Sequence, residues 1–450
     1  MQSENRGEKV MTIEDRIMKL LKEKNVDEAE IFIEREKKKR VFFEKNELKT
    51  LNQDEYTGIG LRVFLKKKQG FAHTNDLSRI EELVEEAVNL ARNSQEDPYV
   101  GLPDPEEVEM VEDLYHEDVE KTTLEDTLRL GKNLVEIPRK VDSRISIDSA
   151  EVVVSSREKK ILNTKGLSLT ERKSTVRYFV MGMAVEGEKV SSFDYRVGGD
   201  VKIEGIEDKI KESAESFAKD ILKTLGARTC ESFKGSVLLS PDAFAMIFAM
   251  PISSLINAES VQERRSPWAG KLGEKVASDV LTFIDEPRKP SSIFSTSFDR
   301  EGVPTRRTVI IENGVLKTYI YNTYTARKEN RKSTGHASGW YRSMPSISVI
   351  SPSFVSTLPL KKIFEKIDKG IYVRRFSGNA NPVSGVFSGT VKGGRFIEKG
   401  EKTFPLIGTM ISGSIFESLK RISAVSEEKE ITSFGELPYV LVEDVSVVSK

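Results

Sequence analysis

Short runs of alternating apolar and polar residues recur along the first half of the chain. The segments that begin at Ala29 (AEIFIEREKKKRVFFEKNELKTLNQ) and at Ala150 (AEVVVSSREKKILNTKGLSLTERKS) both show this alternation, interrupted by charged or glycine-containing turns. A period of two is typical of half-buried strands, and short turns between such runs indicate an antiparallel meander. The two segments therefore predict two meanders about 120 residues apart.

Helical periodicity surrounds each meander. One helix pattern precedes each (TIEDRIMKLLKEK from Thr12 and LEDTLRLGKNLVEI from Leu124), and one follows each (LSRIEELVEEAVNLARNS from Leu77 and IEDKIKESAESFAKDILKTL from Ile206). In the segment from Leu77, a 3.6-residue period places one set of apolar residues on a single face: Ile80, Leu83, Val84, Ala87 and Leu90. The layout favours a duplicated helix–meander–helix unit, and two similar layouts that arose by chance are the alternative.

The pattern changes after Ala227, where strand-like runs dominate and few helices are expected. Asn313-Gly314 stands between two alternating runs and predicts a tight hairpin. The predicted fold class is thus α+β, with two helix–antiparallel meander–helix units followed by a C-terminal, mainly antiparallel β domain. We expect an N-terminal α+β unit at 1–110, a second unit that repeats it at 111–228, and the β-rich domain at 229–450.

Composition narrows the class of protein. Lys and Arg number 70 against 71 Asp and Glu, so the net charge of -1 gives no field that would attract nucleic acid or an anionic membrane. The basic runs at 36–40 and 65–70 are interpreted as solvated hairpin ends. A single cysteine, Cys230, and no uninterrupted apolar span favour a soluble protein of a reducing cytoplasm.

Residues for catalysis or metal binding are scarce. His73, His116 and His336 lie in unrelated segments, and no metal-ligand spacing, nucleophile elbow or phosphate-binding loop occurs. Two glycines in GIGLRVF, from Gly58, lie inside a meander and do not form a nucleotide loop. We therefore expect no catalytic residue, no metal ligand and no cofactor in this chain.

Two segments still suggest function. The loop STGHASGWYRSMPS from Ser333 contains Gly335, His336 and Trp340, and it is either a binding element or an ordinary crossover. The segment FDREGVPTRRTV from Phe298 is rich in both charge signs, and buried charge pairing is favoured there over catalysis.

Four motifs carry a resemblance to a known family. They are GFAHTNDLS (70–78), SPWAGKLGEKVAS (266–278), FDREGVPTRRTVIIENGVLKTYIYNTYTARK (298–328) and STGHAS (333–338). In this order they resemble the TldD/PmbA family, formerly labelled modulator of DNA gyrase, over nearly the whole chain. The resemblance implies a zinc metallopeptidase in the TldD branch and a partner subunit in the PmbA branch, also called TldE.

The resemblance also implies where the zinc ligands of the TldD branch would lie. An ungapped count from Ser266 places its two histidines near Ala249 and Ser254 and its acid near Met250, and the C-terminal stretch from Ile431 has no cysteine for the third ligand. The helix before Ser266 keeps an apolar face of Phe244, Ile247, Phe248, Leu255 and Ile256. Pro251 is expected to kink it.

The resemblance thus favours a PmbA/TldE-type subunit without its own zinc, paired with a TldD-like metallopeptidase in cytoplasmic processing of small or unfolded peptides. Alone, the chain is expected to form at least a homodimer, with no nucleic-acid or membrane partner. Residues expected to contact substrate or partner are Arg264, Arg265, Gly335, His336 and Trp340. Two alternatives are an autonomous hydrolase with a site around His336 and a binding protein that modulates DNA gyrase.

Overall fold

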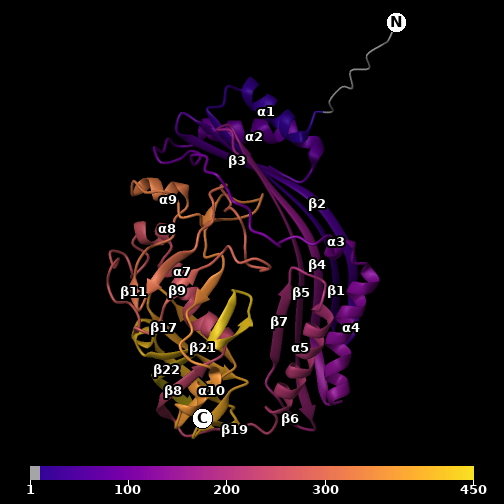
Figure 1. Cartoon of the computed structure of the whole chain (residues 1–450), viewed down its shortest axis with the longest axis vertical. Coiled ribbons are helices and arrows are strands. Elements are labelled where there is room, and N and C mark those ends of the chain that lie inside the picture. The colour runs from indigo at the N-terminus through magenta and orange to yellow at the C-terminus, as the bar shows by residue number, and fades with distance from the viewer. Residues whose placement is uncertain (1–10, 450) are drawn as a thin grey trace.

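The computed structural model describes residues 11–449, in which a long curved sheet lies beside the C-terminal half of the chain (Figure 1). The order in the N-terminal sheet is β3-β2-β1-β4-β5-β6, and β7 pairs with β5. Its strands are β1 (Glu28–Glu44), β2 (Glu47–Leu65), β3 (Lys68–Thr74), β4 (Ile145–Asn163), β5 (Ser168–Glu186), β6 (Lys189–Val190) and β7 (Asp194–Asp200). Because β1 pairs antiparallel with β4, the two predicted meanders form one continuous sheet.

Each meander is preceded and followed by a helix, as the periodicity predicts. The helices are α1 (Ile13–Glu23), α2 (Ile80–Asn93), α3 (Glu117–Lys121), α4 (Leu124–Val141) and α5 (Ile206–Leu222), with a 3-10 turn at Leu77–Arg79. Thr12 and Thr123 start α1 and α4 with capping boxes, each completed by an aspartate three residues later. The α+β class with two helix–meander–helix units is confirmed. The domain boundaries stay a prediction.

The face assigned to α2 needs one correction. Ile80, Leu83, Val84 and Ala87 are buried as expected, but the side chain of Leu90 is 47% exposed and Ala91 is buried instead. The helix ends at Asn93, so Leu90 lies in its last turn. Gly70 of β3 lies against Ala87 and Ala91, where an added Cβ would overlap the helix backbone, so this close approach selects the small Ala91 for the buried position.

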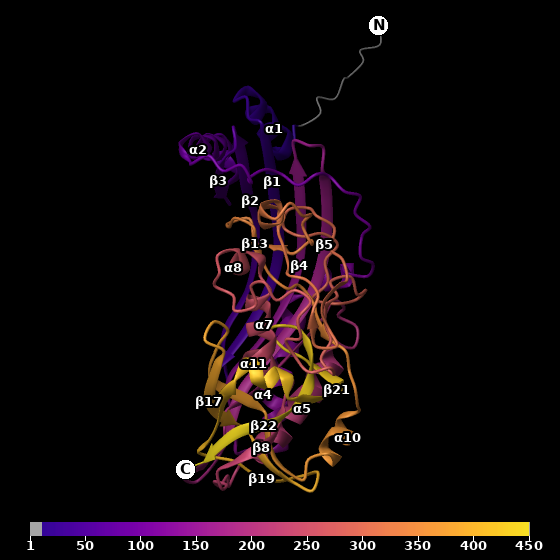
Figure 2. The same ribbon diagram turned by 90° about the vertical axis from the view of Figure 1, so that its left-hand side faces the viewer.

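The two faces of the N-terminal sheet have opposite character. Odd residues of β1 and β2, such as Ile31 and Leu61, pack against α1 and α2, while even residues of β4 and β5, such as Val152 and Val176, pack against α4 and α5. The opposite face carries charged and small residues, and the C-terminal half lies in front of the long strands in the turned view (Figure 2). The polar face of the sheet is therefore an interface within the molecule.

One predicted hairpin end is wrong. The basic run 36–40 lies in the middle of β1, since the alternation continues through it to Val41 and Phe43, which pack with α4. Lys37 and Arg40 form ion pairs with Glu120 and Glu151. The run 65–70 does lie at a turn, between β2 and β3.

The C-terminal half is mainly antiparallel, as predicted. A nine-stranded sheet has the order β16-β17-β20-β22-β8-β15-β18-β19, with β21 beside β22, and only β8 and β15 pair in parallel. Its strands are β8 (Phe233–Leu239), β15 (Lys369–Val373), β16 (Arg375–Asn381), β17 (Val386–Lys392), β18 (Arg395–Glu398), β19 (Glu401–Pro405), β20 (Thr409–Ser414), β21 (Ile422–Ile431) and β22 (Glu436–Ser449).

Two smaller sheets complete this half, in the orders β11-β10-β9-β14 and β12-β13. They contain β9 (Phe283–Asp285), β10 (Thr308–Glu312), β11 (Val315–Leu316), β12 (Ala337–Ser338), β13 (Ser346–Ile347) and β14 (Pro352–Phe354). The predicted hairpin at Asn313-Gly314 joins β10 to β11, with φ of 47° and 77° at the two turn residues.

Helices in the C-terminal half are short. They are α6 (Pro241–Phe244), a π-helical turn (Ala245–Ala249), α7 (Met250–Leu255), α8 (Ala258–Gln262), α9 (Thr323–Lys328), α10 (Leu360–Glu365) and α11 (Ile415–Lys420). Among residues 11–449, no helix has the length and apolar character needed to cross a membrane.

Candidate functional site

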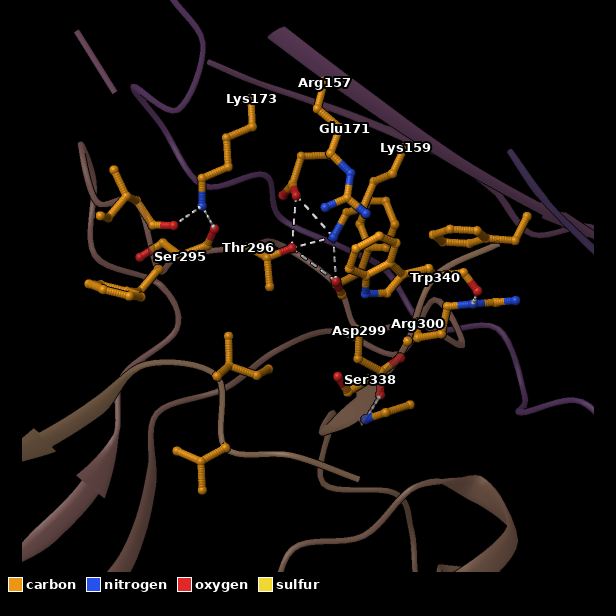
Figure 3. Close-up of a pocket in the computed structure, with 18 of the residues that line it drawn as sticks. Arg157, Lys159, Glu171, Lys173, Ser295, Thr296, Asp299, Arg300, Ser338 and Trp340 are labelled. Carbon is orange, nitrogen blue, oxygen red and sulfur yellow. Dashed lines mark hydrogen bonds and ion pairs between the residues drawn. The ribbon is translucent and has the colours of Figure 1, made fainter. Parts of the chain in front are cut away.

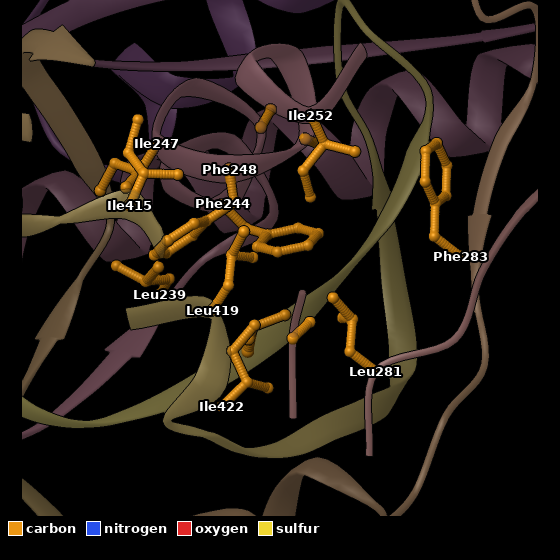
Figure 4. Close-up of a cluster of buried hydrophobic side chains, with 14 of the residues drawn as sticks. Leu239, Phe244, Ile247, Phe248, Ile252, Leu281, Phe283, Ile415, Leu419 and Ile422 are labelled. Atoms are coloured by element: carbon orange, nitrogen blue, oxygen red, sulfur yellow. The ribbon is translucent and has the colours of Figure 1, made fainter. Parts of the chain in front are cut away.

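The helical segment 241–255 is the apolar centre of the C-terminal half. Phe244, Ile247 and Phe248 are buried and pack with residues of the surrounding strands and of α11, as Figure 4 shows. Phe244 and Phe354 meet edge-on with ring centroids 4.8 Å apart. Leu255 and Ile256 are also buried, so the apolar face predicted from the sequence is confirmed.

Pro251 perturbs this helix without ending it. Proline has no amide hydrogen to donate to the carbonyl of Ile247, and its ring collides with that carbonyl in regular α geometry. The preceding residues Ala245–Ala249 form a wide π turn, which closes with a hydrogen bond from the Met250 amide to the Ala245 carbonyl. Turns of this kind occur often at functional sites and re-aim the side chains that follow them.

The exposed face of the same helix forms one wall of a groove of about 480 Å³. Met246, Met250, Ser253 and Ser254 line it from the helix, and Asn257 follows them. The opposite wall includes Gly378, Asn379 and Ala380 of β16, together with Ile347 and Phe434. Because β16 is the edge strand of the nine-stranded sheet, the groove runs beside a strand that has a partner on one side only.

The groove is unsuited to a zinc ion. Met246 and Met250 present thioethers and Ser253 and Ser254 hydroxyls, whereas zinc sites use imidazoles, thiolates and carboxylates. Ala249, on which the ungapped count placed the first histidine, is completely buried and points away from the groove. Within residues 11–449, no group of three or more His, Cys, Asp or Glu is arranged to hold a metal.

Arg264 and Arg265 lie just beyond α8 and away from the groove. Both are exposed, Arg264 has a positive φ of 57°, and Arg265 forms an ion pair of 2.5 Å with Glu263. Neither side chain lines the groove. Their predicted contact with a peptide or partner therefore requires an exposed surface beside α8.

His336 has a structural environment. Its side chain is 1% exposed, and its Nε2 lies 2.9 Å from Asp285 Oδ2. Asp285 in turn accepts hydrogen bonds from the amides of Ile350 and Ser351. Gly335 has a φ of 75° and lies against the Pro304 carbonyl, where an added Cβ would be too close. Both residues are buried, so their predicted contact with substrate or partner stays a prediction.

Trp340 is the predicted contact residue that lines a cavity. Its side chain is 64% exposed, and it stands at a hollow between the N-terminal sheet and the C-terminal half. The next residue, Tyr341, is buried against Gly58 and Gly60 of β2, and an added Cβ at either glycine would overlap it. The loop from Ser333 therefore both crosses the sheet and borders a cavity.

The segment from Phe298 forms the buried charge pairs that the sequence favours. Arg300 Nη1 donates to Glu30 Oε1 at 2.6 Å, and Arg62 donates to both Glu30, at 2.5 Å, and Glu301, at 3.0 Å. All four side chains are almost fully buried. Burial alone would raise the pKa of Glu30, but the two guanidinium groups outweigh it and lower that pKa.

Comparison with known proteins supports one family over nearly the whole chain. Family models described as the PmbA/TldA metallopeptidase domain 1, central domain and C-terminal domain match residues 29–91, 117–231 and 232–449. The chain belongs to the PmbA/TldD family. This confirms the resemblance drawn from the four sequence motifs.

Relatives of both branches align over most of their length. A Metalloprotease PmbA homolog of Buchnera aphidicola is 25% identical, with 94% of each chain covered. A Metalloprotease TldD homolog of Haemophilus influenzae is 23% identical over 92% of this chain and 88% of its own. An uncharacterized protein of Methanocaldococcus jannaschii is 27% identical over 83% and 85%.

Two solved structures share the fold. TldE from Thermococcus kodakarensis superposes with a TM-score of 0.88 at 24% identity, covering 97% of this chain and 100% of that one. A Thermotoga maritima protein named for a proposed modulation of a DNA gyrase superposes with a TM-score of 0.87 at 26% identity, covering 97% and 99%. The gyrase connection is thus found in the name of a related protein.

Local sequence patterns do not identify the groove residues Met246, Met250 and Ser253. In an apolar helix, methionines at i and i+4 are normally interpreted as core. Pro251 is the signal that the sequence offers, since a proline inside a helix disturbs its regular geometry.

Proposed function

We propose that this chain is a PmbA/TldE-type subunit that acts with a TldD-like zinc metallopeptidase in the cytoplasmic processing of small or unfolded peptides. The observation that supports the proposal is the chemistry of the side chains that line the groove. A protein of a metallopeptidase family presents thioethers and hydroxyls, from Met246, Met250, Ser253 and Ser254, on the helix face that lines it. The zinc would then be held by the partner.

The groove has features suited to an extended peptide. Thioether side chains adapt to apolar groups of varied shape, and β16 offers an edge strand to which a peptide backbone can add. Such contacts select an unfolded chain with little preference for sequence. In the absence of the partner, we expect the subunit to pair with itself through at least about 1,000 Å² of surface.

The proposal is tested by reconstitution with a TldD-like zinc peptidase from the same genome. Light scattering should show at least a homodimer for the chain alone and a mixed complex after addition of the partner. Cleavage of an unstructured peptide should require the mixture. Equal cleavage by this chain alone, or a monomer that ignores the peptidase, would contradict the proposal.

A groove variant sharpens the test. Met250→Arg puts a cation on the groove wall at a side chain that is 44% exposed, so the fold should persist while peptide cleavage by the complex falls at least tenfold. Met110→Arg is the matched control, because Met110 is 43% exposed and lies outside the groove. Equal cleavage by the two variants would remove the groove from the proposal.

A further inference from the structure

A second cavity, of about 600 Å³, lies between the second unit of the N-terminal sheet and the C-terminal half. Arg157, Lys159, Lys173 and Arg177 line it from β4 and β5. Loop residues that include Ser295, Asp299 and Trp340 line the other side. Figure 3 shows Arg157, Lys159 and Lys173 pointing from the sheet toward these loops.

The strand register places two cations directly opposite each other. Arg157 of β4 faces Lys173 of β5, while the next pair on this face, Lys159 and Glu171, has opposite charges and forms an ion pair of 2.9 Å. Directly opposed side chains lie about 5 Å apart at Cβ, and like charges in such a pair destabilise a sheet. Arg177 adds a third cation four residues along β5.

These three cations lack a full set of partners. The Lys173 ammonium donates to the carbonyls of Ile293 and Ser295, at 2.8 and 2.6 Å, and forms no ion pair among the described residues. Arg157 donates to Glu34 at 2.6 Å, but its buried Nε has no hydrogen-bond partner. The guanidinium of Arg177 forms neither a hydrogen bond nor an ion pair within residues 11–449.

The two carboxylates of the cavity are engaged elsewhere. Glu171 accepts from Lys159, from the Thr296 hydroxyl at 2.8 Å and from the Ser297 amide. Asp299 accepts from the amides of Glu301, Val303 and Ala337, at 2.8, 3.0 and 2.9 Å. Neither carboxylate forms an ion pair with Arg157, Lys173 or Arg177. Arg157 pairs with Glu34 of β1, outside the cavity lining, and Lys173 and Arg177 have no carboxylate partner among the described residues.

We propose that this cavity binds an oxyanion, carried either by free phosphate or by the carboxylate of a peptide. The anion would lie among Arg157, Lys173 and Arg177, where charge-assisted hydrogen bonds satisfy the free donors. The buried hydroxyl of Ser295, which has no hydrogen-bond partner, supplies one further donor. Trp340 at the rim offers an apolar face to the remainder of the ligand.

The electrostatics of Lys173 agree with this site. Burial lowers the pKa of Lys173 to about 7. The charges that face it are Glu171, Lys159, Arg177 and Arg157, together with Glu34 and Glu36 on β1 and Asp299 in the loop. A bound anion favours the ammonium form, so we expect binding near pH 7.5 to be accompanied by proton uptake.

Calorimetric titration of the purified chain tests the proposal without any partner protein, so it can succeed or fail independently of the proposed function. The probes are inorganic phosphate, an N-acetylated dipeptide with a free carboxylate, and the same dipeptide amidated. We expect saturable binding of phosphate or of the free carboxylate, and none of the amide. Phosphate binding alone identifies phosphate as the source, and binding of the carboxylate identifies a peptide end.

Two substitutions locate the site. Arg177→Gln removes a guanidinium without a partner, so the fold should persist while affinity falls at least tenfold, and Arg177→Lys should restore most of it. Arg139→Gln on α4, which packs on the other face of the sheet, should leave affinity within twofold. Heats no larger than with potassium chloride, or equal affinity of the Arg177→Gln and Arg139→Gln variants, would overturn the proposal.

Discussion

The two halves of the N-terminal sheet have the same layout but meet the C-terminal half in different ways. In the first unit, Glu30 and Arg62 pair with Glu301 and Arg300, and all four are buried. In the second unit, Arg157, Lys173 and Arg177 line a cavity; Arg157 pairs with Glu34, whereas Lys173 and Arg177 form no ion pair among the described residues. Equivalent polar faces therefore perform two tasks, since one fixes the halves together and the other leaves charge available for a ligand.

The largest effect should come from breaking the buried network of the first unit. Glu30→Gln leaves Arg300 without its carboxylate and Arg62 with Glu301 alone, and loss of one partner from a buried charge cluster costs about 3–5 kcal/mol. Glu81→Gln is the control, because the pair of Glu81 with Arg16 is exposed to solvent and should contribute little to stability. Denaturant unfolding of both variants measures the difference, and equal losses would contradict the contrast between the units.

The second unit also has one matched pair, which should determine part of the acid stability. Burial tends to raise the pKa of Glu171, but Lys159 and the hydrogen bonds from Ser297 outweigh it and lower the pKa from 4.5 to about 2. The ionised form is therefore favoured by folding, and its contribution is present above pH 4.5 and lost as the pH falls toward 2.

Unfolding between pH 7 and pH 2 measures this contribution. Glu171→Gln should lower the free energy of unfolding by about 3 kcal/mol at pH 7, which is the stability that corresponds to the lowered pKa of Glu171. The stability of the variant should converge with that of the unsubstituted chain near pH 2. Glu188→Gln changes an exposed carboxyl in the turn between β5 and β6 and should follow the unsubstituted chain throughout. A constant difference across the pH range would contradict the linkage.

A smaller effect should follow from a clash in the first unit. Gly58→Ala adds a Cβ that overlaps the ring of Tyr341, and overpacking of this kind costs about 1–3 kcal/mol. The same substitution in a Tyr341→Ala background should cost much less, because the ring is gone. A double-mutant cycle with no coupling between the two positions would show that the contact is not tight.

The smallest effect is expected at the cavity. Arg177→Gln removes no hydrogen bond and relieves repulsion from Arg157, so stability should change by no more than about 0.5 kcal/mol, toward greater stability at low salt. Lys132→Gln, at an exposed position on α4, is the comparison. A loss above about 2 kcal/mol would mean that Arg177 has a structural role like that of Arg62.

Local signals predicted much of the fold. The helices that begin at Ile13 and Leu124, the meanders between them and the hairpin at Asn313-Gly314 all follow from periodicity, capping residues and turn chemistry. The basic run 36–40 is misplaced by the sequence pattern, because clustered charge indicates a turn although the alternation of strand residues continues through it. The helical period also misassigns Leu90, because it does not show that Gly70 of β3 lies close to Ala91 and places this small residue on the buried face.

The site was harder to predict, for a physical reason. Met246 and Met250 lie in an apolar helical segment, where methionines are normally interpreted as core, and only the structure places them on the face that lines the groove beside β16. Gly58 and Gly60 lie inside a predicted meander, but nothing near them in the sequence identifies Tyr341 as the residue that packs against them. Trp340 was selected from its loop, while Lys173 and Arg177 resembled solvated strand residues.

The sequence by itself determined which side of each strand is apolar, because a period of two fixes alternate side chains on opposite faces. It also determined the helix caps and the tight turn. Only the tertiary structure decided that the polar face of the sheet is covered. Arg300 reaches Glu30 across 270 positions of the chain, and Lys173 reaches the Ile293 carbonyl across 120. Contacts between residues so far apart in the sequence depend on how the two halves of the molecule pack together. The local periodicity of the sequence contains no information about that packing.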